Sequence, residues 1–285
     1  MRLSKALASA ILCGVLAATA VGGAVAAAGF TQPAAGDWRP VDAENTLVID
    51  TNQGRIFVEL YPQVAPQSVM RLKVLARQHF YDGLTFFRVI DDFMDQTGDP
   101  KNSGEGSSTL PNVPGEFAFK RSVAMPFTVA DRAPGLEVGF IGVLPAASKP
   151  IALAQLTADG TVPAEGLFCP GGLGMARADD PNSNNSQFFI MRQAHPQLNG
   201  NYTLAGRVVA GEDVARAIKV GEPVPAPQDT MLKVQVLADM PQASRPKVMV
   251  LDTASAYFAN LVAQSKAARG ADFTVCDIDI PSQVK

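Results

Sequence analysis

An arginine inside an apolar run is the first residue of this sequence that could do chemistry. Arg88 stands between Phe86-Phe87 and Val89-Ile90, in a segment typical of a β-strand. A buried guanidinium needs a hydrogen-bonding partner or water, so we expect Arg88 to face a cleft. Its charge is permanent and its donors form a rigid fork. A position in a cleft is therefore favoured for Arg88 over one in the apolar core.

The residue sets that usually carry catalysis are missing from the sequence. Its two histidines, His79 and His195, are interpreted as solvated or capping side chains. It has no Gly-x-Ser-x-Gly elbow, no HExxH motif and no phosphate-binding loop. The acidic residues are scattered, and no pair of them suggests general acid–base work. A hydrolase or a metal enzyme therefore lacks any supporting cluster of residues, and we expect no cofactor.

Three pairs of sequence blocks, spread between about residues 45 and 237, share one pattern. They are Phe86-Phe87-Arg88-Val89-Ile90 with Phe93-Met94-Asp95-Gln96-Thr97-Gly98-Asp99, Gly174-Met175-Ala176-Arg177 with Asn185-Ser186-Gln187-Phe188-Phe189-Ile190, and Leu198-Asn199-Gly200 with Leu204-Ala205-Gly206-Arg207-Val208. In type, order and spacing they resemble the signatures of the cyclophilins, a family of peptidyl-prolyl cis/trans isomerases. Several blocks in the right order are far more specific than any single motif.

The resemblance implies an isomerase of X–Pro bonds that uses no covalent chemistry. Amide resonance opposes the rotation with a barrier of roughly 18–20 kcal/mol. An enzyme needs only to hold the proline ring and to stabilise the twisted amide more than the planar one. By resemblance, Arg88 reaches the substrate carbonyl and the prolyl nitrogen, Gln96 orients Arg88, and Gln187 binds the substrate backbone.

The resemblance also assigns a substrate-binding surface. The family-matched walls of the proline slot are Phe93, Met94, Phe189 and Leu198, the contacts to the residue before proline are Ala176 and Arg177, and Tyr202 stands where many eukaryotic members carry histidine. Taken alone, each of these apolar residues is more often plain barrel core. Gln197 replaces the tryptophan of many eukaryotic members, which puts affinity for cyclosporin-type inhibitors in doubt.

Short strands and few helices position these residues. Strand-like runs cover residues 46–50, 55–60, 85–90, 94–98, 186–191, 202–209 and 231–237, and helical spacing covers residues 66 to about 80 and 213–219. Many short strands with two helices are typical of a barrel. The pattern therefore predicts a mainly β protein with a closed barrel whose ends are covered by two helices. The resemblance implies that this is a closed antiparallel eight-stranded cyclophilin-like barrel.

Two segments do not fit a minimal barrel. Residues 118–170 form a long insertion, rich in Ala, Pro and Gly, with a short helix expected at 151–156. Residues 241–285 form a C-terminal extension that packs on the domain, with a strand at 247–251 and a helix from 253 to about 268. The isomerase domain, insertion included, is predicted to span residues 45–240 after a linker at 29–44. Glu222–Pro227 is interpreted as a stiff loop entering the last strand.

The first 28 residues indicate export. Arg2 and Lys5 precede an apolar run, and Ala24-Val25-Ala26 offers a cleavage site. We expect a signal peptide and a periplasmic or secreted protein, with an uncleaved membrane anchor as the alternative. In an oxidising compartment Cys169 and Cys276 can pair, so we hypothesise a disulfide that ties the insertion to the tail. Two buried free thiols are the alternative.

The net charge of -3 leaves no basic surplus for binding nucleic acid. We expect proline-containing polypeptides as partners, a monomer, and membrane contact only if the signal segment stays uncleaved. The alternative function is a catalytically weak or inactive peptide-binding, chaperone-like module on the same fold, because fold alone does not establish function. The joint presence of Arg88, Gln96, Gln187 and the apolar slot residues favours catalysis.

Overall fold

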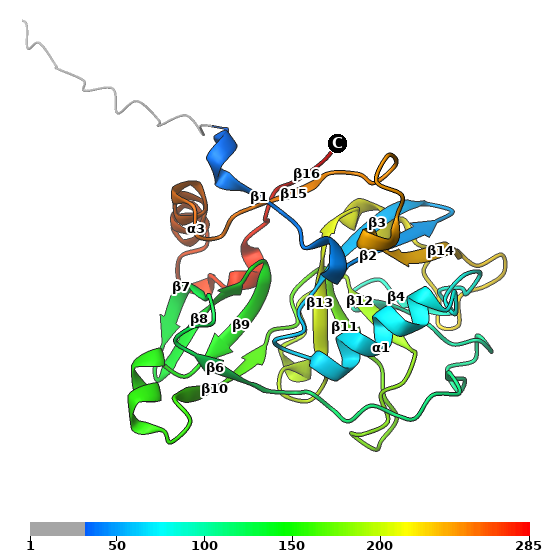
Figure 1. Cartoon of the computed structure of the whole chain (residues 1–285), viewed down its shortest axis with the longest axis horizontal. Helices are drawn as coiled ribbons and strands as arrows, with labels where there is room; N and C mark the ends of the chain where they lie inside the picture. The colour runs from blue at the N-terminus through cyan, green and yellow to red at the C-terminus, as the bar shows by residue number, and fades with distance from the viewer. Residues whose placement is uncertain (1–31) are drawn as a thin grey trace, which may run out of the picture. The chain divides into compact units, whose positions relative to one another are not determined.

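Seven of the eight strands of the central sheet come from the strand-like runs of the sequence, and the eighth, at residues 172–175, was not predicted. The structure, a computed structural model, describes residues 32–285, so the predicted signal peptide lies outside the described residues. The sheet is antiparallel and has eight strands in the order β14-β2-β3-β13-β11-β12-β5-β4 (Figure 1). The strands are β2 (Thr46–Thr51), β3 (Gly54–Leu60), β4 (Arg88–Ile90), β5 (Met94–Thr97), β11 (Gly172–Met175), β12 (Phe188–Met191), β13 (Leu204–Ala210) and β14 (Met231–Val236).

The prediction of a closed barrel is not confirmed, because the sheet curls without a continuous ladder between its edge strands. Near β4 and β14 the structure has one isolated bridge, Thr85–Thr230, outside the named strands. The outer edge of β4 pairs instead with a loop: Val89 donates to the carbonyl of Gly221 at 2.8 Å and accepts from its N–H at 2.9 Å. At the same seam, residues 83–86 and 229–231 exchange three backbone hydrogen bonds, but the strands β4 and β14 themselves are not paired, so the sheet is a curled half-barrel.

Both faces of the first hairpin are buried, which explains its nearly continuous apolar sequence. Leu47 and Ile49 pack in one apolar cluster together with helix α1 (Pro66–Arg77). Val48, between them, packs in a second cluster on the opposite face, as the alternation of a strand requires. The predicted helices at 66–80 and 213–219 are confirmed as α1 and the shorter α2 (Glu212–Ala217). The second cluster also holds the apolar residues of the candidate site.

The long insertion forms a sheet of its own. Five antiparallel strands lie in the order β6-β10-β9-β8-β7 (green in Figure 1). They are β6 (Phe119–Ser122), β7 (Thr128–Ala133), β8 (Leu136–Ile141), β9 (Leu144–Ser148) and β10 (Thr161–Gly166), and the expected short helix is present as the 3-10 turn η3 (Ile151–Leu156). Sequence periodicity missed this sheet because its strands are rich in small residues. At Gly139, for example, a Cβ would lie 2.0 Å from the carbonyl oxygen of Thr128.

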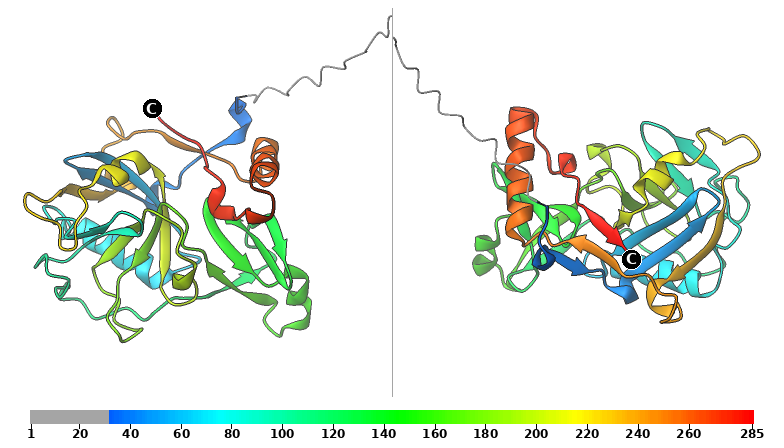
Figure 2. Two further views of the ribbon diagram at one scale, coloured as in Figure 1. Left: turned by 180° about the vertical axis from the view of Figure 1, so that it is seen from behind. Right: turned by 90° about the horizontal axis from the view of Figure 1, so that it is seen from above.

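Segments near both ends of the described residues meet in a third, three-stranded sheet, β1-β15-β16. It consists of β1 (Trp38–Pro40), β15 (Val248–Leu251) and β16 (Ser282–Val284), so part of the segment predicted as a linker is a paired strand. The predicted tail helix is confirmed as α3 (Ala256–Arg269), which Ser255 caps by accepting from the N–H of Phe258. Phe258 packs edge-on against Phe140 of β8 with ring centroids 5.3 Å apart. The tail helix therefore packs on the insertion sheet (Figure 2).

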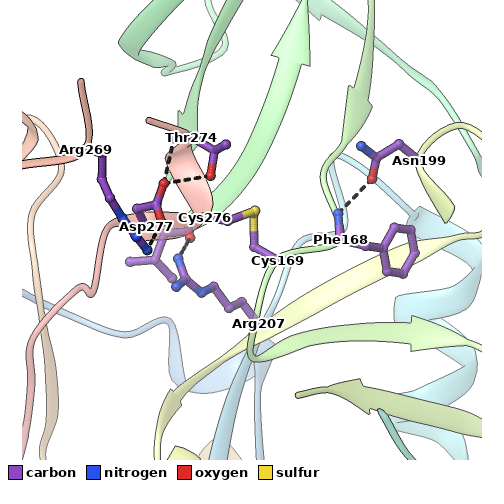
Figure 3. The surroundings of a disulfide bond; sticks show 9 residues. Phe168, Cys169, Asn199, Arg207, Arg269, Thr274, Cys276 and Asp277 are labelled. Carbon is purple, nitrogen blue, oxygen red and sulfur yellow. Dashed lines mark hydrogen bonds and ion pairs between the residues drawn. A yellow bond between two sulfur atoms is a disulfide. The ribbon is translucent and has the colours of Figure 1, made fainter. Parts of the chain in front are cut away.

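Short 3-10 turns connect these elements. They are η1 (Ala35–Asp37), η2 (Ala43–Asn45), η4 (Pro196–Leu198), η5 (Leu237–Asp239), η6 (Gly270–Asp272) and η7 (Val275–Asp277). Cys169 and Cys276, the latter in η7, form the hypothesised disulfide, with Cα atoms 5.0 Å apart (Figure 3). Cys169 is 1% exposed and lies in the same apolar cluster as Phe140 and Phe258. The disulfide therefore joins the insertion to the tail inside a core.

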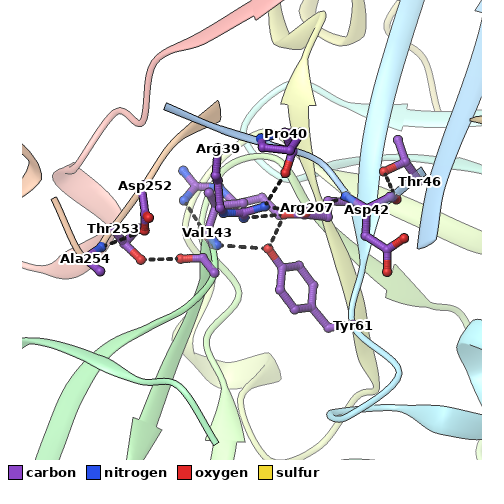
Figure 4. Close-up of polar contacts among 12 residues, drawn as sticks. Arg39, Pro40, Asp42, Thr46, Tyr61, Val143, Arg207, Asp252, Thr253 and Ala254 are labelled. Carbon is purple, nitrogen blue, oxygen red and sulfur yellow. Dashed lines mark hydrogen bonds and ion pairs between the residues drawn. The ribbon is translucent and has the colours of Figure 1, made fainter. Parts of the chain in front are cut away.

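A buried polar network lies where the first strand, the main sheet and the loop after β8 meet (Figure 4). The Tyr61 hydroxyl donates to Glu59 at 2.6 Å and accepts from the N–H of Val143 at 2.9 Å. Arg39 forms a two-pronged pair with the same carboxylate at 2.8 and 2.7 Å. Burial raises the pKa of Tyr61 well above its ordinary value, so the hydroxyl keeps its proton. The network holds three segments distant in sequence in one arrangement.

Candidate active site

Arg88 lies at the start of β4, where the pairing of β4 with β5 sets it opposite Gln96. Its Nη1 donates to Gln96 Oε1 at 3.1 Å, and its Nε donates to Glu222 Oε1 at 2.6 Å. The Arg88 side chain is 34% exposed. Arg88, which was predicted to need a partner or water, thus has two protein partners and is partly exposed to solvent.

The side chains of Gln96 and Gln187 continue the chain of hydrogen bonds that starts at Arg88. Gln96 Nε2 donates to Gln187 Oε1 at 2.9 Å. Gln187 Nε2 donates in turn to the carbonyl oxygens of Gly104 and Gly106, at 2.9 and 2.8 Å. The Gln187 amide fixes the orientation of the Gln96 amide. The Gln187 amide is in turn fixed by two backbone carbonyl groups, which cannot rotate away. The structure therefore brings the three predicted catalytic residues together and orients them.

The loop that contains Gly104 and Gly106, where this chain of hydrogen bonds ends, is held by a carboxylate. Asp99 accepts hydrogen bonds from the N–H groups of Lys101, Ser103 and Gly104 at 2.7, 2.9 and 2.6 Å. Burial alone would raise the pKa of Asp99, but these donors and the N–H of Gly106 lower it below its ordinary value. A Cβ on Gly106 would lie 1.8 Å from Asp99 Oδ1, so only glycine fits beside this carboxylate. Asp99 thus positions the two carbonyls that orient Gln187.

A cavity of about 380 Å³ opens beside Gln96 and Gln187. Its lining includes Ala176 and Arg177, the residues predicted to meet the residue before proline. The Arg177 guanidinium lies 4.4 Å above the ring centroid of Tyr202 and donates to the carbonyl of Ala178 at 2.8 Å. A positively charged rim held over an aromatic face is suited to carbonyl groups of an extended peptide.

The predicted walls of the proline slot gather in one apolar cluster. Its members from the prediction are Phe93, Met94, Ala176, Phe189, Leu198 and Tyr202. Met94, Phe189 and Leu198 are 1%, 5% and 7% exposed, so Phe93 and Tyr202 carry most of the surface. The ring of Phe168, which the sequence did not indicate, stacks on Phe189 at 5.9 Å between centroids. The cluster supplies an apolar surface next to Arg88 and its partners.

Three contacts near this surface were not foreseen from the sequence. Glu222, predicted only as part of a stiff loop, binds Arg88. His195 was interpreted as solvated or capping, yet its Nε2 lies 2.7 Å from the Asp92 carbonyl and its ring 4.5 Å from that of Phe93. Arg192, directly after the strand that carries Phe189, donates to the buried carboxylate of Asp95 at 2.5 Å. Each contact joins residues that are far apart in sequence, so local sequence patterns do not predict it.

Nothing in residues 32–285 groups three or more histidine, cysteine, aspartate or glutamate side chains as a metal site would need. In the same described residues, no helix has the length and apolar character needed to span a membrane. The candidate site brings together the Arg88 guanidinium, the amides of Gln96 and Gln187, and an apolar surface, with the Arg177 guanidinium at the rim of the cavity.

The sequence is similar to a family of known proteins. Residues 46–236 match the family described as "Cyclophilin type peptidyl-prolyl cis-trans isomerase/CLD". A probable peptidyl-prolyl cis-trans isomerase of Brucella suis biovar 1 is 34% identical over 191 residues, which cover 63% of this chain and 74% of that protein. The peptidyl-prolyl cis-trans isomerase-like 1 of Rhizopus delemar is 32% identical over 170 residues, covering 60% of this chain and 77% of the relative.

A solved structure resembles more of the chain than the family match does. The crystal structure of cyclophilin AquaCyp293 from Hirschia baltica superposes with a TM-score of 0.79 at 32% identity. The superposition covers 87% of this chain and 93% of that one. The similarity therefore extends beyond residues 46–236 into the parts that the sequence predicted as additions to a minimal barrel.

Proposed function

This chain belongs to the family of cyclophilin-type peptidyl-prolyl cis-trans isomerases, and we propose that Arg88 performs the isomerisation on proline-containing segments of exported proteins. The family and its activity are the premise. The role of Arg88, the binding surface and the location of the substrates are the proposal.

The observation that carries the proposal is the fixed orientation of the Arg88 guanidinium. An arginine has five N–H donors, and Glu222 and Gln96 occupy two of those of Arg88. Three donors remain for a substrate carbonyl and for the prolyl nitrogen as it becomes pyramidal. Because the donors are oriented before substrate arrives, they stabilise the twisted amide without reorganising. The reaction makes and breaks no covalent bond, so the group needs to transfer no proton.

The surroundings of Arg88 support a binding mode for the peptide. The apolar surface of Phe93 and Tyr202 is placed to receive the proline ring, over the buried Met94 and Phe189. The residue before proline then extends toward the cavity lined by Ala176, Arg177 and Gln187. The enzyme binds the peptide on both sides of the X–Pro bond. The whole peptide therefore cannot rotate freely, and rotation takes place at that one amide.

Two features support an exported protein as the working form. The sequence of residues 1–28 is typical of a signal peptide. The disulfide between Cys169 and Cys276 is the kind of cross-link that persists in oxidising compartments. In that setting, slow prolyl isomerisation limits the folding of many newly exported chains. We therefore propose a periplasmic or secreted monomer that acts on them.

The test measures cis/trans isomerisation of an Ala-Pro-containing peptide by the purified protein and its Arg88→Ala variant. We expect wild-type acceleration and a loss of roughly 100-fold in kcat/KM in the variant, as for loss of a preorganised charge donor. Arg55→Ala is the matched control, because Arg55 is a comparably exposed arginine paired with Asp50. Folded wild-type protein without acceleration would refute the proposal and favour a non-catalytic peptide-binding module.

A further inference from the structure

Glu222 makes the second contact to Arg88, and no motif or resemblance assigns it a role. We propose that Glu222 is a positioning residue for the isomerisation, which holds the Arg88 guanidinium in its working orientation. The inference rests on the proposed function of Arg88 and deepens it.

The backbone on either side of Glu222 is paired with β4. Val89 and Gly221 exchange two hydrogen bonds, at 2.8 and 2.9 Å, in an antiparallel bridge. In that register, Glu222 stands directly opposite Arg88. The position next to a hydrogen-bonded pair is a non-hydrogen-bonded pair, where facing side chains approach most closely. Two residues further on, Val224 donates to the carbonyl of Phe87 at 2.9 Å. The contact is therefore built into the strand register.

The remainder of the loop is anchored at both ends. Val224 is buried in the main core, at 3% exposure. On the other side, Arg192 Nη2 donates to the carbonyl of Ile218 at 2.6 Å, and the N–H of Lys219 donates to Asp229 at 2.7 Å. Glu222 thus projects from a backbone that is fixed before and after it. A carboxylate on a free loop could not hold its partner in one place.

Glu222 and Gln96 accept hydrogen bonds from different nitrogens of the Arg88 guanidinium. Glu222 binds Nε, next to the side-chain stem, and Gln96 binds Nη1 at the outer end. Two such contacts fix the rotation of a long, flexible side chain, and one contact would leave a hinge. The donors left for substrate keep their direction only while both contacts are present.

Stability alone does not account for this ion pair. Arg88 is 34% exposed and Glu222 56% exposed, and pairs as open as this contribute little to folding. Loss of Glu222 is therefore expected to change catalysis and to leave thermal unfolding unchanged. Gln at the same position keeps an oxygen that can accept from Nε, whereas Ala removes it.

The experiment compares the wild type with Glu222→Ala and Glu222→Gln in the same Ala-Pro peptide assay, using exchange NMR to separate kcat from KM. We expect kcat to fall roughly tenfold in Glu222→Ala, with KM within about twofold, because a misplaced catalytic group loses up to about 100-fold. Glu222→Gln should restore kcat to within about threefold of the wild type. Glu212→Ala is the matched control, since Glu212 pairs with Arg216 on the surface.

A second readout follows Arg88 itself. The Nε–H resonance of Arg88, assigned by its loss in Arg88→Ala, should stay sharp in the wild type and in Glu222→Gln and should broaden in Glu222→Ala. If the wild type is active and Glu222→Ala has the same kcat or a higher one, the inference is overturned and the proposed function stands. Failure of Gln to restore kcat would also overturn it. An inactive wild type would instead refute the proposed function, and with it the inference.

Discussion

Reduction of the Cys169–Cys276 disulfide tests how the insertion and the tail support the fold. The two cysteines are 107 residues apart in sequence. In the chain-entropy description, a cross-link closing about 107 residues removes about 16 cal/mol/K from the unfolded chain, or about 4.8 kcal/mol at 25 °C. Cys169 is almost fully buried and its thiol would stay among Phe140, Leu251 and Phe258. We therefore expect most of this entropic contribution to disappear on reduction.

The assay is urea unfolding of the oxidised protein, the reduced protein and the Cys276→Ser variant. The expected result is a fall of about 4–5 kcal/mol in the free energy of unfolding for both altered forms, seen as a lower urea midpoint. Reductant should have no further effect on Cys276→Ser, which controls for its action elsewhere in the chain. An unchanged midpoint in the reduced protein would refute the reasoning. A separate early transition confined to the tail would also contradict it, because the bond would then stabilise that segment alone.

Two further predictions concern the candidate site. Asp99 is an acid whose folded pKa is depressed, so its stabilisation is complete above its ordinary pKa of 3.8 and is lost as the pH falls through the lower folded value. Asp99→Asn should therefore lose about 1–3 kcal/mol at pH 7, a difference that shrinks below about pH 4; urea midpoints across this range measure it, and a pH-independent difference would contradict it. At Gly174, a Cβ would lie 2.4 Å from the Phe189 ring and 2.7 Å from that of Phe168. Gly174→Ala should cost about 1–3 kcal/mol and lower kcat/KM, whereas Gly36→Ala, with nothing within 4 Å, should change neither the melting temperature nor the activity.

Local sequence patterns were sufficient for the first hairpin and the first helix. The runs at 46–50 and 55–60, joined by Thr51–Gly54, form the predicted hairpin, because alternation and turn chemistry act between neighbours in the chain. The helix after Pro66 also begins where its sequence indicates. The insertion sheet was missed because small residues pack there without a strong apolar alternation.

Closure of the barrel is the part of the fold prediction that the structure does not confirm. The strand-like runs indicated seven of the eight strands, and the resemblance to the family implied the eight-stranded antiparallel sheet that the structure contains. They could not show that the loop at Gly221 would take the outer edge of β4. The pairing of a strand edge with a distant loop is decided by tertiary packing, which strand propensity does not contain.

The sequence by itself determined the family, the strands that carry Arg88 and Gln96, the strand that directly follows Gln187, and the two cysteines that could pair in an oxidising compartment. Only the tertiary structure decided that the three site residues form one chain of hydrogen bonds, that most of the proline-slot residues are covered, and that Glu222 faces Arg88. Residues 88 and 222 are 134 positions apart. Their contact depends on the register of one bridge between β4 and a distant loop, and register at that range is set by the packing of the whole core.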